Sequence, residues 1–564
     1  MADKYKTLFL KWCDALLSEQ ITDETDRFFG SFRCKSCATP HGRADNAIYP
    51  FVYAYSLTGK IAYLSAVEKL LVFREKLTDP EGAVQNDFTS EWKGITSFSA
   101  IGLLKTLLYF GDKLPSDLKA KIETAAAASA RWVSEKMTIG FPAYVNYYCA
   151  ASLVNALYYE YAREEIYAER SRELMRYCLG CFTENGLLFG EGKPHDARSP
   201  KGCLPIDIGY VAEESLPCLI HAAAILQDEA ALSILTDHAR KTLDFFLPDG
   251  GLDNSFGVRN NKWTYYGSRT SDGAIGALAF LSKRDERFGD AAERVFLLLE
   301  RCTKNGKLYG GPHYFASGQK PCVHHTFCHA CALADALREG ISERNSSSLP
   351  ENEDRVGFRY YPELDTYLIR AGRYRATVTA YDFVGHTFAR GAAHASGGTL
   401  SLLYKDGKGA LIAGSTYEYE RTEPNNMQTP AGEKKHASLL VRAEYEKDGI
   451  RYATCLDRNA KLSVISEENA IIVSARARFY DVNGQAENPR LFADFTYRFT
   501  PNGVAITASK LDKNVRFILP VVENSSEVLT GNAFEQTPIF YLSGGFSANE
   551  YAFPLSETVT VTIR

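Results

Sequence analysis

One stretch of the sequence, residues 247–270, concentrates side chains suited to anion binding and proton transfer. Guanidinium groups bind carboxylates through paired hydrogen bonds, aromatic rings stack on flat ligand faces, and a phenol acts as acid or base. We therefore interpret this stretch as a binding region for an anionic ligand, with Tyr266 as a catalytic candidate. The residues in it that we assign to substrate binding are Arg259, Trp263, Tyr265 and Arg269.

The same residues also have a purely structural interpretation. Arg259 would pair with Asp253, and Arg269 would pair with Asp272, so that the two ion pairs hold a long loop in place. The aromatic rings would then only close one end of the domain. Loop closure rarely needs so many hydrogen-bond donors together, so we favour the binding interpretation.

A second group of candidates surrounds the start of a predicted helix. His313 and Tyr314 precede this helix and are assigned to substrate binding, whereas His324 and His325 lie at its entry and are assigned to catalysis. The positive end of a helix dipole disfavours a charged imidazole, so a histidine there stays neutral and can accept a proton. The alternative is that these histidines only pack between helices.

Two groups of soft ligands raise the question of a bound metal. The first group, on the same predicted helix, consists of His325, Cys328, His329 and Cys331. The second group, in one loop near the start of the chain, consists of Cys34, Cys37 and His41. The first spacing fits no common structural zinc finger, and the second group lacks a fourth ligand. We therefore expect no cofactor, with zinc as the alternative.

Two further helix starts supply candidates of other types. Tyr210 opens a predicted helix and is assigned to catalysis, and Glu213 or Glu214 could orient a neighbouring cation. Asn146 and Tyr147 open another predicted helix and are assigned to substrate binding. An asparagine at this position is explained equally well as a helix N-cap.

The elements that must position these residues are helices over the first 345 residues. Apolar residues recur there at the three- and four-residue spacing of amphipathic helices. The predicted helices lie near residues 3–18, 45–56, 61–76, 95–109, 116–136, 146–161, 165–180, 211–226, 229–246, 271–282, 288–303 and 325–339. Twelve helices in six hairpins predict an (α/α) toroid, with the helices that are apolar all round in its inner ring.

The connections between these helices alternate between short and long. Short turns lie at residues 57–60, 110–115, 161–164, 227–229 and 283–287. Long loops lie at residues 20–43, 78–94, 138–145, 181–209, 247–270 and 304–323. Short connections make consecutive helices antiparallel neighbours, so all the long loops should meet at one end of the toroid. We expect the candidate residues on these loops to form one site.

Composition sets limits on the kind of protein. A net charge of −5 argues against broad binding to nucleic acid, and no apolar run is long enough to cross a membrane. Thirteen cysteines at scattered spacing, with no signal peptide, predict reduced thiols and a cytoplasmic location. The oligomeric state stays open, a homo-oligomer included.

After Gly340 the sequence pattern changes. A polar linker at residues 342–348 leads into segments with two-residue alternation, so we predict a helical domain at residues 1–345 and an antiparallel β-sandwich domain at residues 346–564. The protein is therefore predicted to be an α+β multidomain chain. Its hairpin signals are Asp406-Gly407, Asp448-Gly449, Asn483-Gly484 and Asn502-Gly503.

Several candidates lie on loops whose role is harder to predict. His195 lies in a loop that contains Gly and Pro, where it either covers a bound substrate as a catalytic residue or faces solvent. His386, His394 and the Asn425-Asn426 pair of the second domain either extend to the toroid or only dock the two domains.

A toroid followed by an all-β domain resembles the heparinase II/III-like polysaccharide lyases. Segments 267–273, 322–327 and 423–428 are similar to segments of such proteins. The resemblance implies β-elimination on a glycan that contains uronic acid. It implies Tyr and His as acid and base, and an Asn, such as Asn146, or an Arg to neutralise the uronate carboxylate.

The sequence thus predicts a lyase that acts on an acidic polysaccharide or oligosaccharide. One alternative is a glycoside hydrolase on the same toroid, which would need two carboxylates about 6.5–9.5 Å apart if it inverts. The carboxylates available for this role are Asp207, Glu213, Asp253 and Asp272. The other alternative is a glycan-binding protein without catalysis, in which Tyr210, Tyr266, His324 and His325 would all be buried and bonded to one another.

Overall fold

The fold is taken from a computed structural model of the chain. It describes residues 2–37, 39–269, 271–316, 318–340, 355–384, 394–420, 435–436, 438–523, 526–539 and 545–564. The linker at 342–348, His386, and the segment that contains Asn425 and Asn426 lie outside the described residues, so the predictions made for them are not tested.

The N-terminal region consists of helices, as predicted. They are α1 (Ala2–Glu19), α2 (Ile48–Thr58), α3 (Ala62–Glu75), α4 (Thr96–Phe110), α5 (Ser116–Lys136), α6 (Val145–Ala162), α7 (Glu165–Leu179), α8 (Ile208–Tyr210), α9 (Leu216–Ile225), α10 (Glu229–Thr242), α11 (Ile275–Leu281), α12 (Glu286–Arg301) and α13 (Val323–Glu339). A π-helical segment, η3 (Val211–Ser215), joins α8 to α9, so these three form one continuous helix. Counted this way, the twelve predicted helices are confirmed.

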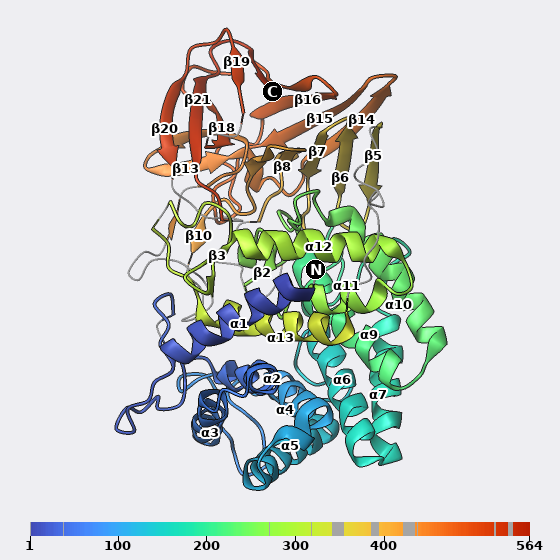
Figure 1. Cartoon of the computed structure of the whole chain (residues 1–564). Helices are drawn as coiled ribbons and strands as arrows, with labels where there is room; N and C mark the ends of the chain where they lie inside the picture. The colour runs from blue at the N-terminus through green and yellow to red at the C-terminus, as the bar shows by residue number, and fades with distance from the viewer. Residues whose placement is uncertain are drawn as a thin grey trace.

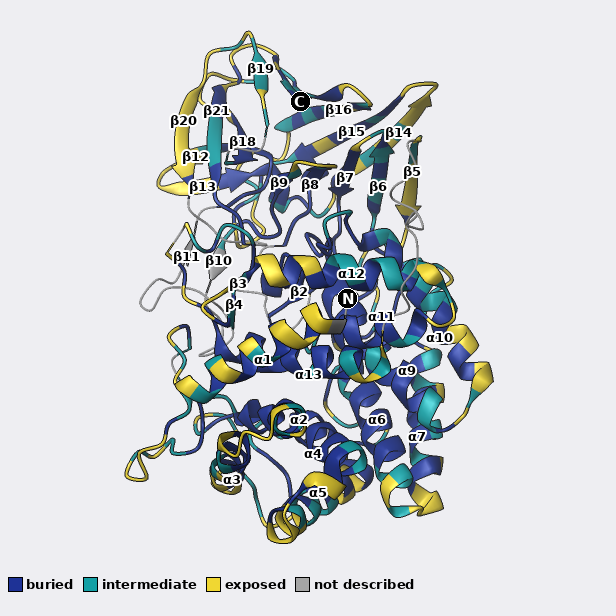
Figure 2. Cartoon of the chain, in the orientation of Figure 1, coloured by how far each residue is buried: buried dark blue, intermediate teal, exposed yellow. Residues whose placement is uncertain are grey.

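The helices form an inner and an outer set. Nearly every residue of α4 is buried, which fits its largely apolar sequence, and most residues of α13 are buried too, whereas α10 and α12 keep an exposed polar face. Figure 2 shows the exposed faces on α5, α10 and α12 and the buried helices between them. Helix α1 packs against α13, so the first and last helices close the toroid.

Short elements lie in the connections. They are η1 (Gly42–Ala47), which runs directly into α2, η2 (Gly111–Lys113), η4 (Leu243–Phe245), η5 (Asn260–Lys262), and the small strands β1 (Trp263–Thr264), β2 (Gly267–Ser268), β3 (Thr303–Lys304) and β4 (Lys307–Leu308). Strands β1 and β2 pair with each other within the loop 247–270. This pairing gives the long loop a fixed hairpin at its tip.

The C-terminal region is built from antiparallel sheets. One sheet has the order β5 (Val356–Tyr361), β6 (Thr366–Ala371), β7 (Tyr374–Thr379), β8 (Thr399–Lys405), β9 (Gly409–Ala413). A second has the order β14 (Lys461–Glu467), β15 (Ala470–Arg478), β16 (Phe492–Thr500), β17 (Gly503–Ala508), β22 (Val559–Ile563), β19 (Val528–Thr530). A third has the order β13 (Ile450–Ala453), β12 (Arg442–Lys447), β18 (Arg516–Val522), β21 (Ala548–Pro554), β20 (Glu535–Ile539). A short pair, β10 (Tyr419–Glu420) and β11 (Lys435–His436), and the 3₁₀ turn η7 (Thr454–Leu456) complete the described elements.

All four predicted hairpin signals lie between paired neighbouring strands. They are Asp406-Gly407, Asp448-Gly449, Asn483-Gly484 and Asn502-Gly503. The connection that contains Asn483-Gly484 is longer than the others, and Asp481 forms a turn in it by binding the backbone of Asn483 and Gln485. The sheets share one apolar core, formed by alternate residues of their facing strands.

The sheet domain docks on the end of the toroid that carries the long loops 181–209, 247–270 and 304–323. Glu363 accepts hydrogen bonds from Thr183 and Asn185, and Lys201 binds Asp365 at 2.8 Å. Figure 1 shows the sheets stacked on one side of the helical half. Helix α13 ends at Glu339 and β5 begins at Val356, so the predicted boundary falls between the two. None of the described helices has the length and apolar content to cross a membrane.

Candidate active site

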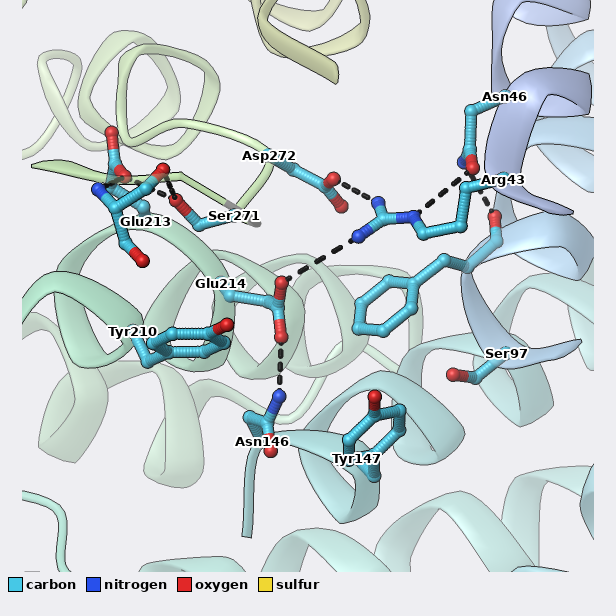
Figure 3. A network of polar contacts seen from close by, with 12 residues as sticks. Arg43, Asn46, Ser97, Asn146, Tyr147, Tyr210, Glu213, Glu214, Ser271 and Asp272 are labelled. Atoms are coloured by element: carbon cyan, nitrogen blue, oxygen red, sulfur yellow. Dashed lines mark hydrogen bonds and ion pairs between the residues drawn. The ribbon is translucent and has the colours of Figure 1, made fainter. Parts of the chain in front are cut away.

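A buried guanidinium, that of Arg43, lies at the centre of a polar network inside the toroid (Figure 3). It contacts the ring of Phe98 at 4.1 Å, donates a short hydrogen bond to Asp272, and lies 3.9 Å from the carboxylate of Glu214. Residue Arg43 belongs to η1, where the ring nitrogen Nδ1 of His41 caps its backbone N–H. Glu214 and Asp272 lie far from Arg43 in the sequence, yet both carboxylates lie beside its positive charge.

Two more carboxylates of the network, those of Glu213 and Glu214, come from the π-helical segment η3. Glu213 accepts hydrogen bonds from the backbone N–H of Ser268, at 2.6 Å, and from the hydroxyl of Ser271. Gly267 makes this approach possible, because a Cβ atom there would lie 1.8 Å from the Glu213 carboxyl carbon. Single π-helical turns within α-helices occur frequently at functional sites. Here the turn presents two consecutive acidic residues to the interior.

Glu214 and Asn146 form the second part of the network. The amide Nδ2 of Asn146 donates to Oε1 of Glu214 at 2.6 Å. Within the described residues, Oε2 of Glu214 and Oδ1 of Asn146 have no hydrogen-bond partner although both atoms are buried. Burial raises the pKa of Glu214 to about 8, and Asp272 adds to the rise. At neutral pH this carboxyl group is therefore mainly protonated and able to donate a hydrogen bond.

The predicted residues Tyr210 and Arg259 lie in direct contact. The guanidinium of Arg259 lies 3.9 Å from the centre of the Tyr210 ring and donates to its hydroxyl at 2.9 Å. On its other side Arg259 forms a buried ion pair with Glu191 at 2.7 Å. Asp207 caps the helix that begins at Ile208 by accepting from the backbone N–H of Tyr210. The Arg259 guanidinium therefore fixes the position of the Tyr210 hydroxyl.

A chain of aromatic and acidic groups links Tyr266 to Glu213. The hydroxyl of Tyr266 and Nδ1 of His325 lie 2.8 Å apart, and the Tyr266 ring also contacts His329. Nε2 of His329 lies 3.5 Å from Glu213. Burial lowers the pKa of His325 well below its ordinary value, so its imidazole is neutral.

His324 differs from its neighbour in having no such partner. It is 2% exposed, and neither of its ring nitrogens has a hydrogen-bond partner among the described residues. Its ring packs edge-on against His41, with the ring centres 4.6 Å apart. Burial, followed by the neighbouring His41 and Arg43, lowers the pKa of His324 well below its ordinary value. A neutral imidazole can accept a proton, so His324 is a candidate for proton transfer.

Electrostatic interactions connect Arg43 and Arg259 with the same neighbouring side chains. The charge of Arg43 acts on His324, and the charges of both Arg43 and Arg259 act on Tyr147. Tyr147 in turn accepts a hydrogen bond from Trp92 at 3.1 Å. The network thus extends from Tyr210 and Arg259 through Glu214 and Arg43 to the histidines, as expected for loops that meet at one end of the toroid.

Other predicted residues lie around the network rather than in it. Trp263 is fully buried and donates to the carbonyl of Leu252, Tyr265 donates to Asp249 and packs on Phe546, and Nδ1 of His313 lies 3.3 Å from the Ser547 hydroxyl. Tyr314 is buried beside Gly545, and Arg269 donates to the carbonyl of Asn261. The structure therefore places these five residues in the loop interior and in the contact with the sheet domain.

The structural alternative predicted other ion pairs than those observed. Arg259 pairs with Glu191, and Asp272 pairs with Arg43, whereas Asp253 accepts from Ser255 and Thr377.

The possible metal ligands on α13 make other contacts. Nδ1 of His329 is hydrogen-bonded to the His325 carbonyl. Among the described residues, the single group of metal-type ligands close enough to hold an ion is Cys34, Cys37 and Cys322.

His195 lies apart from the network. Its Nδ1 is 2.9 Å from the Tyr177 hydroxyl and its Nε2 is 2.7 Å from the Ala143 carbonyl, so the ring fastens its loop to α7 and to the loop before α6. We expect the substitution His195→Ala to destabilise folding by about 1 kcal/mol while leaving kcat nearly unchanged. Urea unfolding and initial-rate kinetics measure the two effects. A large loss of kcat in a folded variant would instead place His195 in catalysis.

Several network residues escaped the sequence analysis. Arg43 was not considered, His41 was considered only as a metal ligand, and Glu191 was not assigned a role. One signal in the sequence points to Arg43. The polar string Gly42-Arg43-Ala44-Asp45-Asn46 directly precedes an apolar helix, where a buried segment is expected. The structure shows that all five residues are buried. Charged residues rarely become fully buried unless they are paired, so such a string points to a polar interior.

His394, a docking candidate of the second domain, is buried. Its Nε2 lies 3.1 Å from the carbonyl of Tyr381, whose hydroxyl donates to the carbonyl of Leu204 in the loop 181–209. The residue therefore supports the contact between the two domains.

Comparison with known proteins gives a family for this arrangement. Residues 9–353 match the model of the ulvan lyase N-terminal domain, and residues 358–538 match that of the ulvan lyase C-terminal domain. The chain is 34% identical over 535 residues to a broad-specificity ulvan lyase of Formosa agariphila, an alignment that covers 92% of this chain and 83% of that protein.

A solved structure supports the fold independently. Heparinase III superposes with a TM-score of 0.53 at 13% sequence identity, covering 93% of this chain and 76% of that one. The predicted fold class and the predicted heparinase-like relationship are confirmed. The matches to both domain models and to the curated relative establish that the chain belongs to the ulvan lyase family and is a polysaccharide lyase.

Proposed function

We propose that the protein cleaves a uronate-containing polysaccharide of the ulvan type by β-elimination. In this reaction a base removes the proton next to the uronate carboxyl group, and an acid protonates the departing glycosidic oxygen. The proton is weakly acidic until the carboxylate charge is neutralised and the developing enolate is held by fixed donors. The name of the Formosa agariphila relative supports ulvan as the substrate.

The observation that carries the proposal is the pair Asn146 and Glu214. Oε1 of Glu214 already accepts from Asn146, which leaves Oε2 to carry the proton and to face a ligand. A protonated carboxyl group in a buried site donates a strong hydrogen bond to a developing enolate, as a protonated Asp does in ketosteroid isomerase. Arg43, 3.9 Å from Glu214, adds positive charge at the same place.

Tyr210 and His324 are the proton-transfer groups of the proposal. Arg259 holds the hydroxyl of Tyr210 through its hydrogen bond and lies over the ring, and its charge would stabilise a phenolate formed during proton transfer. His324 has two buried ring nitrogens without partners among the described residues, and the charge of Arg43 acts on it. We assign the two residues jointly as base and acid, and Tyr266 with His325 as groups that support this side of the site.

The two alternative functions have less support. The family assignment to lyases speaks against a glycoside hydrolase, although Glu213, Glu214 and Asp272 line one pocket. The binding-protein alternative required four residues that are buried and bonded to one another. His324 is buried but has no bonded partner among the described residues, so that condition is not met.

A single assay tests the proposal. The full-length protein is incubated with ulvan, and ultraviolet absorbance is followed together with the number of new reducing ends. β-Elimination forms an unsaturated uronate, so absorbance and reducing ends should rise in equal molar amounts. A rise in reducing ends without absorbance would identify a hydrolase, and no change on ulvan or on other uronate polymers would contradict the proposal.

The substitution His324→Ala is expected to lower kcat by about 10²-fold or more, the lower range for positioned proton transfer. The reason is that no other described histidine in the network has both ring nitrogens without a partner. Initial rates on ulvan measure the effect. The matched control is His238→Ala, which removes a half-buried histidine stacked on Phe182, away from the network, and should keep full activity.

A further inference from the structure

The loop 20–43 and the start of α13 bring three cysteine thiols together. Sγ of Cys322 lies 3.5 Å from that of Cys37 and 3.9 Å from that of Cys34, and all three sulfur atoms lie within 4.8 Å of one another. Cys322 is separated from the other two by 285 and 288 residues, so only the fold reveals the group. From the sequence, Cys34 and Cys37 were grouped with His41, and no fourth ligand was identified.

From this geometry we propose that Cys34, Cys37 and Cys322 bind a zinc ion. Zinc–sulfur bonds of about 2.3 Å in tetrahedral geometry place neighbouring sulfur atoms about 3.8 Å apart, which is close to both measured separations. Zinc is the common ion for tetrahedral thiolate sites, and a fourth position is left for water or another donor. A disulfide would join only two of the three thiols and leave the third beside it.

The surroundings of the thiols also suit a metal site. Backbone N–H groups of Ser36 and Val323 donate to the sulfur of Cys34, and such bonds stabilise a thiolate ligand. The hydroxyl of Ser36 donates to the carbonyl of Lys320 at 2.7 Å, so the two segments are also held together directly. These contacts hold the loop that carries Cys34 and Cys37 beside the start of α13.

The position of the site defines what the ion would do. Cys37 precedes His41 on the first long loop, and Cys322 precedes His324 at the start of α13. The rings of His41 and His324 pack against each other. Zinc would join the first loop to the last inner helix where the toroid closes, and it would fix the relative position of these two histidines. The ion is a positioning element and takes no part in the proposed proton transfers.

Metal analysis of the full-length protein tests the proposal directly. The protein is purified under reducing conditions without chelators, or reconstituted with zinc chloride. Elemental mass spectrometry should then find about one zinc ion per chain. Cys34→Ser, Cys37→Ser and Cys322→Ser should each lose most of the zinc. Cys331→Ser is the matched control, because Cys331 is also half-buried but bonds to the Asn46 carbonyl, and it should keep the zinc.

Two measurements on the unmodified chain guard against variants that fail to fold. Cobalt substitution should produce the intense thiolate-to-cobalt absorption of a tetrahedral site. The thiols are alkylated, and the modified peptides are identified by mass spectrometry. Cys34 and Cys37 should be protected from alkylation until a zinc chelator is added. Absence of bound zinc after reconstitution would overturn the proposal. So would protection that a reductant removes and a chelator does not, because that result identifies a disulfide.

Discussion

The substitution Tyr210→Phe is expected to reduce kcat on ulvan by about 10²- to 10⁴-fold, the range that positioned acid–base groups contribute. Phenylalanine keeps the ring that lies 3.9 Å from the Arg259 guanidinium but removes the hydroxyl to which that guanidinium donates. Substrate binding should change little, because the ring and the ion pair between Arg259 and Glu191 remain. Initial rates by ultraviolet absorbance give kcat and KM separately.

Tyr265→Phe provides the matched control for this experiment. Tyr265 is as fully buried as Tyr210, and its hydroxyl also bonds a charged residue, Asp249, at 3.1 Å. It lies against Phe546 of the sheet domain and outside the network. We expect this variant to lose some stability and to keep its kcat. Equal losses of kcat in the two variants would show that Tyr210 acts through folding and not through proton transfer.

Glu214 is expected to tolerate glutamine far better than alanine. Glutamine keeps an oxygen that can accept from Asn146 and supplies an N–H in place of the proposed carboxyl O–H. We expect Glu214→Gln to stay within about tenfold of the parent, and Glu214→Ala to lose about 10²- to 10³-fold in kcat, the effect of removing a fixed donor to a developing anion. If glutamine is as damaging as alanine, the protonated-carboxyl role is wrong.

The pH dependence of the reaction provides a second readout for Glu214. Its pKa is raised to about 8, so the active protonated form prevails below that pH and is lost above it. The value of kcat/KM, which reports groups of the free enzyme, should therefore fall as the pH rises through 8. Glu214→Gln has no proton to lose and should not show this fall. Identical profiles for the two proteins would contradict the assignment.

The helical half of the fold could be predicted closely because its signals are local. The spacing of apolar residues located α5 at Ser116–Lys136, as the pattern at 116–136 had indicated. Short turns were equally clear, since Gly59 ends α2 in a left-handed conformation that glycine adopts at little cost. The alternation of short and long connections then placed the candidate residues at one end of the toroid.

The site could be predicted only in part because its pairings are not local. The sequence indicated Tyr210, Arg259 and Asn146 one by one, but not that Arg259 would pair with Glu191. Loop 247–270 looked like one binding surface, yet a tight hairpin turns Trp263 into the loop interior. The ion pair joins residues 68 positions apart, and the hairpin depends on backbone pairing, so neither is visible in residue spacing.

Because of the π-helical turn at Val211–Ser215, the number of residues in this helix decides where Tyr210 lies. Such a turn holds one residue more than a turn of α-helix. Each residue of an α-helix rotates the direction of the next side chain by about 100° about the helix axis. Deletion of Ala212 alone would let the helix become regular while the residues from Leu216 onward keep their packing. Tyr210 would then rotate away from Arg259, although no residue that touches the substrate would be missing. Alignments of relatives should therefore be inspected for a one-residue gap here before activity is inferred from matching side chains.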